Sequence, residues 1–392
     1  MRFSWNLALL VVGMLVSCAG AALDEETSAP EAPTCDSGLC EPEQVDPPPK
    51  QYISNSFGVP QLVEGPKTAQ TMERIKAMTA YMRQTVFRDE SMQHVKRVCQ
   101  NRDRLCAFWA SIGECESNPA FMKLSCAPAC FSCEQIDFET RCPMDNLGPD
   151  IWAAGDLNQM FEGIMEGAAS LNISATALSR PGMDPTVLRG TPWIIELDDF
   201  LTDEECATLI QLGSDLGYDQ SKDVGVKQFD GSYQGQESAY RTSTNTWCEN
   251  ACFEHDVTRS VMERIETLTR LPESNSEYLQ LLRYEKGQRY HVHHDFVPHH
   301  VDRQQGPRIV TFFLYLNDVE EGGETYFPDM DLRVKPSRGK AIVWASVMDS
   351  DPNRKDPRTS HEALPVIEGV KYAANAWYHL RDFKEPHATN CV

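Results

Sequence analysis

The chain has 392 residues, which at roughly 150 residues per domain allows two or three domains. With 36 Lys and Arg against 58 Asp and Glu, its formal charge is −22, which disfavours general nucleic-acid binding because no counterion release would drive it. A basic peptide or a cation remains a possible partner. Hydrophobic residues make up 41% of the chain, enough for a packed core, and 14 cysteines indicate an oxidising compartment.

The first residues have the pattern of a signal peptide. Arg2 precedes an uncharged apolar stretch that ends at Ala19-Gly20-Ala21, an A-x-A cleavage pattern, so residues 1–21 are predicted to be removed. An uncleaved membrane anchor is the main alternative, and a lipoprotein box ending at Cys18 is a weaker one. The predicted location is the secretory pathway, in the lumen of the endoplasmic reticulum or Golgi or after secretion. The glycosylation sequon at Asn172 fits this route.

An acidic spacer and a helical segment follow. Residues 22–50 hold eight acidic residues, one Lys and six prolines, so a disordered spacer is predicted through residue 65. Within it, Cys35 and Cys40 could close a small loop. Residues 66–98 have apolar residues near helical spacing, which predicts a helix with a packing face. These apolar positions are Ile75, Met78, Met82 and Val86.

Residues 99–133 hold six cysteines with the spacing C-x6-C-x8-C-x10-C-x3-C-x2-C. Because this segment is too short to form a sufficient apolar core, we expect disulfides to stabilise it. A zinc site is the alternative, but no His lies among these cysteines. The spacing resembles the ShK toxin-like module, and this resemblance implies the pairs Cys99–Cys133, Cys106–Cys126 and Cys115–Cys130. The module could be a spacer, a docking domain for protein or substrate, or a channel blocker.

The rest of the chain divides into a connector, a sheet-rich domain and a tail. Residues 134–188 form the predicted connector, with helical patches, and residues 386–392 the tail. Within residues 189–385, a strand at 192–197 precedes a helix from Asp203 to about Leu212, with Gly213 as its expected stop. Four further strands are predicted at 278–284, 308–316, 340–346 and 371–380.

The segment YEKGQRYHVHHDF, residues 284–296, contains an H-x-D motif at His293 and Asp295. On a strand, residues two apart face the same way, so both side chains can reach one ion. A second His from elsewhere would complete the two-His, one-carboxylate set of non-haem Fe(II) oxygenases. A second H-x-D, at His300 and Asp302, lies in the following loop and lacks the preceding Tyr and Gly residues.

Three ordered motifs, YEKGQRYHVHHDF, RIVTFFLYLNDVEEGGETYFP and SHEALPVIEGVKYAANAWYH, resemble those of prolyl 4-hydroxylases of the 2-oxoglutarate and Fe(II)-dependent dioxygenase superfamily. The resemblance runs from about residue 193 to 381. It implies a mainly β fold, a double-stranded β-helix or jelly roll with flanking helices. It also implies His361 as the distal iron ligand, with His379 and His387 as weaker candidates for that role.

The same resemblance assigns the remaining site residues. Lys371 would pair with the distal carboxylate of 2-oxoglutarate, since burying this dianion without a partner is costly. Tyr284 would donate its hydroxyl to that carboxylate, and Thr311 is a second candidate or an ordinary strand residue. The expected substrate-side residues are Tyr290, Arg308, Trp377 and His379. Trp377 could instead be a core aromatic residue and Arg308 an ion-pair partner. Arg241 resembles part of a mobile loop over the peptide.

The predicted function is therefore a procollagen-proline 4-dioxygenase-like activity on proline-rich proteins. Its cofactors would be Fe(II), 2-oxoglutarate and L-ascorbate, and it would use O2 and release succinate and CO2. One alternative keeps this chemistry but places the hydroxyl on a peptidyl lysine or a small molecule. The other alternative is a non-catalytic secreted interaction protein. Two departures from the family pattern, His294 within H-x-D and Tyr372 after Lys371, remove no predicted ligand.

Overall fold

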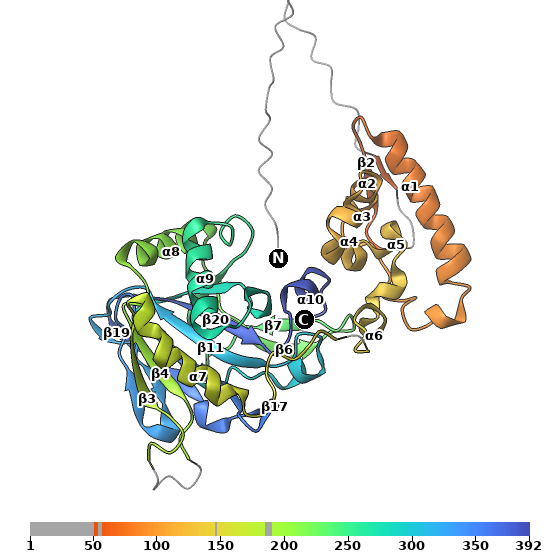
Figure 1. Ribbon diagram of the computed structural model, residues 1–392. Coiled ribbons are helices and arrows are strands. Elements are labelled where there is room, and N and C mark those ends of the chain that lie inside the picture. The colour runs from red at the N-terminus through yellow and green to blue at the C-terminus, as the bar shows by residue number, and fades with distance from the viewer. Residues whose placement is uncertain (1–50, 54–56, 146, 185–189) are drawn as a thin grey trace, which may run out of the picture. The chain divides into compact units, whose positions relative to one another are not determined.

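The computed structural model describes residues 51–53, 57–145, 147–184 and 190–392 (Figure 1). The predicted signal peptide or anchor, the acidic stretch through residue 50 and the loop between Cys35 and Cys40 lie outside these residues. Within the described part of the chain, no helix is both long and apolar enough to cross a membrane.

A small disulfide-rich domain comes first, drawn in orange to gold in Figure 1. Its elements are β1 (Gln51–Ile53), β2 (Gln61–Val63), α1 (Thr68–Tyr81), the π-helical turn η1 (Met82–Val86), η2 (Glu90–Met92), α2 (Cys106–Ser111), α3 (Glu114–Ser117), α4 (Pro119–Ser125), α5 (Ala127–Cys130) and η3 (Cys133–Ile136). The predicted apolar face of the first helix is buried and packs against the half-cystines. The disulfides join Cys99 to Cys133, Cys106 to Cys126 and Cys115 to Cys130, the pairs that the resemblance implies.

Two antiparallel sheets form the second domain. The large sheet has the strand order β3-β4-β15-β11-β20-β9-β8-β5 and the small one β10-β18-β13-β14. The large sheet consists of β3 (Ser174–Ser179), β4 (Ile194–Asp198), β5 (Asp219–Gln220), β8 (Thr244–Cys248), β9 (Leu279–Tyr284), β11 (Arg308–Tyr315), β15 (Ala341–Ala345) and β20 (Lys371–His379). The small sheet consists of β10 (Tyr290–His293), β13 (Thr325–Phe327), β14 (Leu332–Val334) and β18 (His361–Ala363).

One apolar cluster joins the facing surfaces of the two sheets. It contains Phe313 and Trp344 from the large sheet and Phe327 and Ala363 from the small one. A second cluster covers the outer surface of the large sheet with three helices. These helices are α7 (Asp156–Gly167), α8 (Asp203–Leu216) and α9 (Asp256–Thr269). Two facing antiparallel sheets with helices on one side confirm the predicted jelly roll.

Helix α8 begins where predicted and ends four residues later than predicted. Thr202 and Glu205 form a capping box at its start. The prediction that Gly213 ends the helix is wrong, because α8 continues to Leu216 and Gly217 takes the positive φ of the end. Gly213 is instead buried, where a Cβ would lie 2.2 Å from the Tyr218 hydroxyl and 3.3 Å from Leu281.

The segment predicted as a connector contributes α7 and β3 to the β domain, and α6 (Phe138–Arg141) precedes them. The shorter elements are β6 (Asp223–Lys227) and β7 (Tyr233–Gln236), which form a hairpin, η4 (Ala168–Leu171), η5 (Glu273–Asn275), η6 (Pro298–Asp302), β12 (Glu321–Gly322), η7 (Pro328–Met330), β16 (Val347–Met348), β17 (Asp351–Lys355), η8 (Pro357–Thr359), β19 (Val366–Glu368) and α10 (Lys384–Ala388).

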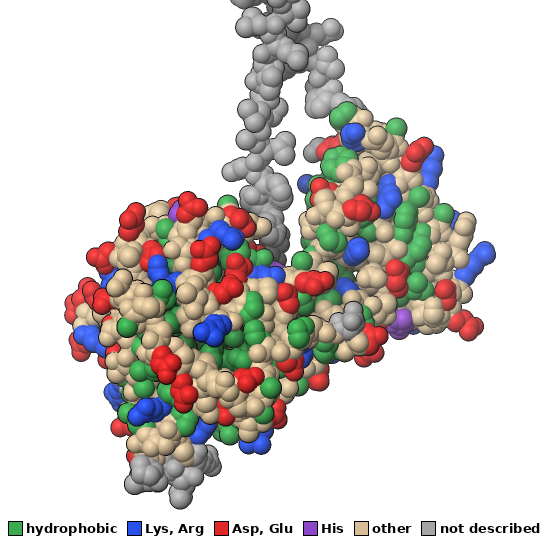
Figure 2. Space-filling view, in the orientation of Figure 1, with side chains coloured by type: hydrophobic (Ala, Val, Ile, Leu, Met, Phe, Trp, Pro, Cys, Tyr) green, Lys and Arg blue, Asp and Glu red, His purple; other side chains and the backbone are tan. Residues whose placement is uncertain are grey.

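The other described cysteines form two disulfides and one buried thiol. Cys248 pairs with Cys252, as their proximity in sequence suggested, and Cys142 pairs with Cys391. Cys206 is the one free cysteine of the described residues, and burial raises the pKa of its thiol to about 11. The acidic side chains are spread over the face shown in Figure 2 and interspersed with Lys and Arg.

Candidate active site

The small sheet brings the three predicted iron ligands together. His293 ends β10 and His361 begins β18, and the two residues lie directly opposite each other in the antiparallel pair. Asp295 follows two residues after His293, and its Oδ2 lies 3.7 Å from His361 Nε2. One ligand atom from each residue lies within 4.8 Å of the others. The local strand geometry and the long-range pairing of β10 with β18 together create this group.

Hydrogen bonds fix which nitrogen each imidazole presents. His293 Nδ1 lies 2.8 Å from the His291 carbonyl oxygen, and His361 Nδ1 lies 3.0 Å from the Thr359 carbonyl oxygen. Because a carbonyl can only accept, each Nδ1 carries the proton and donates. Nε2 of both rings is therefore left with its lone pair free, which is the form that binds a metal ion.

The charge states also suit a divalent cation. Burial lowers the pKa of His293 well below its ordinary value, so the ring is neutral. Burial alone would raise the pKa of Asp295, but His361, His293 and a hydrogen bond from Thr311 outweigh it and hold this pKa below its ordinary value. Two imidazoles that donate from Nδ1 to carbonyl oxygens, together with one carboxylate, match the donor set of non-haem Fe(II) sites.

A buried lysine lies deeper in the jelly roll. Lys371 is 1% exposed, and its Nζ donates to the Gly323 carbonyl oxygen at 2.8 Å. Burial lowers its pKa to about 7, although the charge of Glu324 acts in the opposite direction. Tyr284 lies opposite it in the β9–β20 pair, with its ring centroid 5.3 Å from Nζ. This site fits an anionic group, since a carboxylate would compensate the buried ammonium.

A narrow cavity contains the three metal-site residues and Tyr284, the strand neighbour of Lys371, while Lys371 itself does not line it. Its walls carry the three metal-site residues and an aromatic and polar lining: Arg241, Tyr284, Tyr290, Phe313, Thr325, Trp344, Ala363, Asn375 and Trp377. Thr325 was not predicted. Its hydroxyl lies 2.7 Å from the Tyr315 hydroxyl, and the residue lines the cavity together with Tyr284. No short motif marks it, because its role depends on strand β13 facing β9 across the fold.

The four expected substrate-side residues separate into two layers. Tyr290 and Trp377 line the cavity, and the Tyr290 ring stacks on His293 with centroids 3.5 Å apart. Arg308 lies behind Trp377, with its guanidinium carbon 3.8 Å from the centroid of a Trp377 ring, and His379 is fully buried. Neither Arg308 nor His379 lines the cavity, so neither is placed to contact a substrate inside it.

Arg308 and His379 both bind the carboxylate of Glu277, a residue that the sequence did not indicate. Glu277 accepts from Arg308 at 2.5 Å and lies 2.8 Å from His379 Nε2. Burial alone would raise the pKa of Glu277, but Arg308 and His379 outweigh it and lower this pKa strongly. The ion-pair alternative for Arg308 is thus present in the structure. Glu277 has no local sequence signal, because both partners come from distant strands.

Comparison with known proteins decides the family. Residues 279–379 match the model of the 2OG-Fe(II) oxygenase superfamily, and residues 98–133 match the ShK domain-like model. Probable prolyl 4-hydroxylase 7 of Arabidopsis thaliana is 31% identical over 232 residues, which cover 53% of this chain and 70% of that protein. The chain belongs to the prolyl 4-hydroxylase family. Prolyl 4-hydroxylase 2 of the same plant is also 31% identical, over 58% of this chain and 81% of its own length.

Among solved structures, the 2-oxoglutarate complex of a viral collagen prolyl hydroxylase from Paramecium Bursaria Chlorella virus-1 is 29% identical. The aligned residues cover 47% of this chain and 95% of the viral protein, with a TM-score of 0.37. Family membership confirms the predicted enzyme class, an Fe(II)- and 2-oxoglutarate-dependent dioxygenase of prolyl 4-hydroxylase type, and the ShK-like domain is confirmed as well.

Several residues of this prolyl 4-hydroxylase differ from the expectations above. Thr311, expected to contact 2-oxoglutarate, donates its hydroxyl to Asp295 Oδ2 at 2.7 Å. The second H-x-D lies in η6, where the His300 ring lies 5.4 Å from that of His379 and outside the metal group. His387 packs on Phe383, so it is not part of that group either.

His294 turns away from the iron ligands, as the strand alternation predicted. Its Nε2 lies 2.7 Å from the Asp356 carbonyl oxygen and 3.1 Å from the Thr359 hydroxyl. It therefore ties β10 to the loop just before His361, which supports the position of both histidine ligands.

Proposed function

We propose that the enzyme hydroxylates C4 of peptidyl proline in proline-rich proteins of the secretory pathway. It would consume 2-oxoglutarate and O2 and release succinate and CO2, with L-ascorbate keeping the iron reduced. The observation that carries this proposal is the open two-His, one-carboxylate group, which shares one cavity with two aromatic walls and lies in the same fold as the buried Lys371.

His293, Asp295 and His361 would hold the iron, and all three residues line the cavity. The bound Fe(II) and 2-oxoglutarate supply the oxidising power. The chain's own contribution is to orient the ligands through the carbonyl contacts of both histidines and the Thr311 hydroxyl. It also excludes water, because Asp295 and His361 are buried.

Lys371 would bind the distal carboxylate of 2-oxoglutarate, with the hydroxyl groups of Tyr284 and Thr325 as further donors. The reason is electrostatic: the ammonium is buried with a single backbone acceptor, and a carboxylate would complete its coordination. Binding of the anion favours the protonated lysine, so the pKa of Lys371 should rise on complex formation.

Tyr290 and Trp377 would position the proline ring beside the iron ligands. Both aromatic rings line the cavity, and aromatic surfaces are common partners of proline-rich chains in the polyproline II conformation. Arg308 and Glu277 would act indirectly, by holding Trp377 in place from behind. Collagen-like and other proline-rich proteins are candidate substrates on this basis.

A secretory location is supported by the five disulfides of the described residues. Disulfides of this number persist in oxidising compartments and are rare in the cytosol. Targeting itself would depend on the N-terminal residues, which lie outside the described part of the chain.

The test is a turnover assay on proline-rich peptides with Fe(II), 2-oxoglutarate and ascorbate. The product is read by mass spectrometry, with the oxidised residue located by fragmentation. Asp295→Asn should abolish both peptide oxidation and succinate release, whereas Asp302→Asn, in the second H-x-D, is the matched control and should retain them. Succinate release with oxygen added to lysine or a small molecule would replace proline as the acceptor. Absence of succinate from folded, iron-loaded enzyme would refute the catalytic proposal and favour a binding protein.

A further inference from the structure

We infer that Phe138 and Arg141, in the short helix that follows the ShK-like domain, are positioning residues for the peptide substrate. They hold the tip of the β6–β7 hairpin in place beside the entrance to the active site. This inference rests on the proposed function, because it concerns the affinity for a peptide, but the contacts themselves can be tested without any substrate.

The tip of the hairpin fits around the Phe138 ring. Gly231 has a φ of +82°, and a Cβ at this position would lie 2.3 Å from Phe138 Cδ2. The aromatic ring thus occupies the space that a side chain would need. Arg141 Nη2 donates to the Asp230 carbonyl oxygen at 2.7 Å, so the same short helix binds two successive residues of the tip.

A second arginine completes the contact from the catalytic side. The guanidinium carbon of Arg303 lies 3.7 Å from the Phe138 ring centroid and 5.8 Å from that of Tyr233. Its Nη2 also donates to the Gly231 carbonyl oxygen. Arg303, the residue directly after η6 of the jelly roll, therefore contacts both Phe138 and the hairpin.

The hairpin contacts η6, and the chain that follows it reaches the cavity. Tyr233, in β7, stacks on His299 of η6 with ring centroids 3.8 Å apart. Arg241, just beyond the hairpin, forms a β-bridge with Tyr290, and its guanidinium carbon lies 4.7 Å from the Tyr290 ring centroid. Since Tyr290 and Arg241 line the cavity, the position of the hairpin bears on its entrance.

Three apolar side chains of the hairpin are exposed among its polar ones. Val224, Val226 and Phe229 are 59%, 71% and 52% exposed. Exposed apolar side chains next to an active site are suited to contact a substrate, here a proline-rich chain of low polarity. A hairpin held at both its base and its tip would present this surface without first losing conformational freedom.

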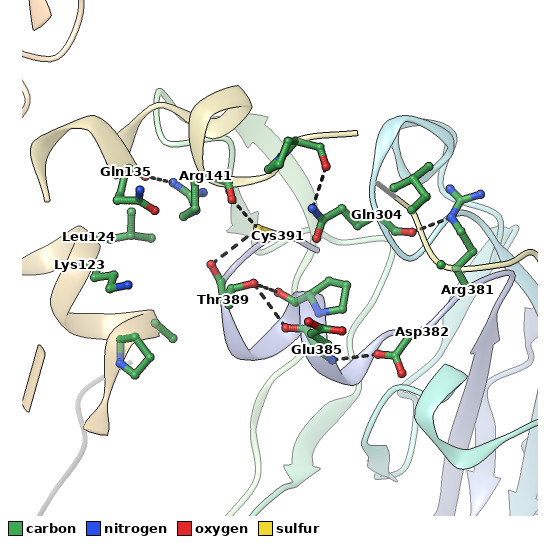
Figure 3. A pocket seen from close by; sticks show the side chains of 16 residues that line it. Lys123, Leu124, Gln135, Arg141, Gln304, Arg381, Asp382, Glu385, Thr389 and Cys391 are labelled. Carbon is green, nitrogen blue, oxygen red and sulfur yellow. Dashed lines mark hydrogen bonds between the residues drawn. The ribbon is translucent and has the colours of Figure 1, made fainter. Parts of the chain in front are cut away.

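The helix that holds the tip is itself fixed to the carboxyl terminus. Cys142, directly after Arg141, forms the disulfide with Cys391. Arg141 also donates to the carbonyl oxygen of Gln135 (Figure 3) and to that of Asn390. These links to the carboxyl-terminal residues and to the preceding helix give α6 the rigidity that a positioning element requires.

If the tip is released, the hairpin will populate positions that cannot bind the peptide, and the apparent affinity will fall with the competent fraction. Loss of one charge-assisted hydrogen bond and its aromatic contact is expected to weaken peptide binding by about tenfold. The binding of 2-oxoglutarate should not change, because Lys371 and Tyr284 lie on the large sheet and make no contact with α6.

The experiment compares Phe138→Ala and Arg141→Ala with Arg74→Ala in the full-length enzyme. Arg74 is the matched control, since it also donates to a backbone carbonyl and lies over a phenylalanine ring, but within the ShK-like domain. The two test variants should raise the KM for a proline-rich peptide about tenfold with kcat and the KM for 2-oxoglutarate unchanged. Hydrogen exchange of residues 223–236 should accelerate in both test variants and not in the control.

A double-variant cycle identifies the contact. Gly231→Ala should loosen the hairpin in the presence of Phe138 and do so less in Phe138→Ala, because the clash requires the ring. Unchanged hydrogen exchange in both test variants would refute the proposal that Phe138 and Arg141 fix the tip of the hairpin. Faster exchange with an unchanged peptide KM would overturn the positioning role. If the wild-type enzyme oxidises no peptide, the proposed function is refuted. The exchange measurement would still decide whether α6 fixes the tip of the hairpin.

Discussion

At the residue scale, Lys371 is the group whose protonation should control binding of 2-oxoglutarate. Burial lowers its pKa from 10.5 to about 7, so in the free enzyme the lysine loses its charge as the pH rises above 7. Binding of the anion requires the charged form. The dissociation constant should therefore increase between pH 7 and pH 9, by up to about tenfold per pH unit. Anaerobic calorimetry with Fe(II)-loaded enzyme measures this.

Lys371→Arg is the control for that prediction. A guanidinium stays protonated throughout this range, so the variant should lose the pH dependence whatever its absolute affinity. A dissociation constant of the wild-type enzyme that does not change from pH 7 to pH 9 would contradict the assignment of Lys371.

Thr311 is predicted to support the metal site through Asp295. Thr311→Val keeps the shape of the side chain and removes the hydroxyl that donates to Oδ2, so Fe(II) affinity should fall about 10- to 100-fold. Thr269→Val is the control, because the buried Thr269 hydroxyl contacts only the backbone of Ile265 and Leu271, away from the metal site. Equal losses of iron affinity in the two variants, measured by competition with a chelator, would argue against the role of Thr311.

At the element scale, the sequence predicted those features whose cause is local. Each strand with a continuous apolar run was found to within about two residues, and the H-x-D motif placed His293 and Asp295 on one side because alternation is a property of any strand. Glu277 and Thr325 were missed because their partners come from other strands. The same limitation explains the wrong prediction for Gly213. The sequence suggests that it ends the helix, but it is needed where the helix packs against Tyr218 and Leu281.

Two glycines inside helices should respond in opposite ways to alanine. Gly213→Ala in α8 places a Cβ against Tyr218 and Leu281, so the free energy of unfolding should fall by about 1–3 kcal/mol. Gly163→Ala in α7 meets nothing within 4 Å and should raise it by about 0.5–1 kcal/mol through helix propensity. Chemical denaturation measures both. A stabilised Gly213→Ala would mean that the neighbouring side chains adjust without cost.

At the scale of the whole molecule, the Cys142–Cys391 disulfide is the covalent cross-link of the described residues that spans the longest part of the chain. Nothing in the spacing of Cys142 or Cys391 indicated a partner, because the pair depends on where the complete β domain returns its last residues. The bond joins the segment after the ShK-like domain to the final residues, across 249 positions. It therefore encloses the whole catalytic domain in one covalent loop.

Removing this loop closure should cost more stability than removing a short one. A disulfide removes more chain entropy from the unfolded state the longer its loop, so Cys142→Ala with Cys391→Ala should lower the free energy of unfolding by about 5–6 kcal/mol. The Cys248–Cys252 disulfide spans 4 positions, and its double alanine variant should cost about 2 kcal/mol by the same relation. Urea denaturation followed by tryptophan fluorescence compares them. Equal losses would mean that local packing, and not closure of the catalytic domain, determines what each disulfide contributes.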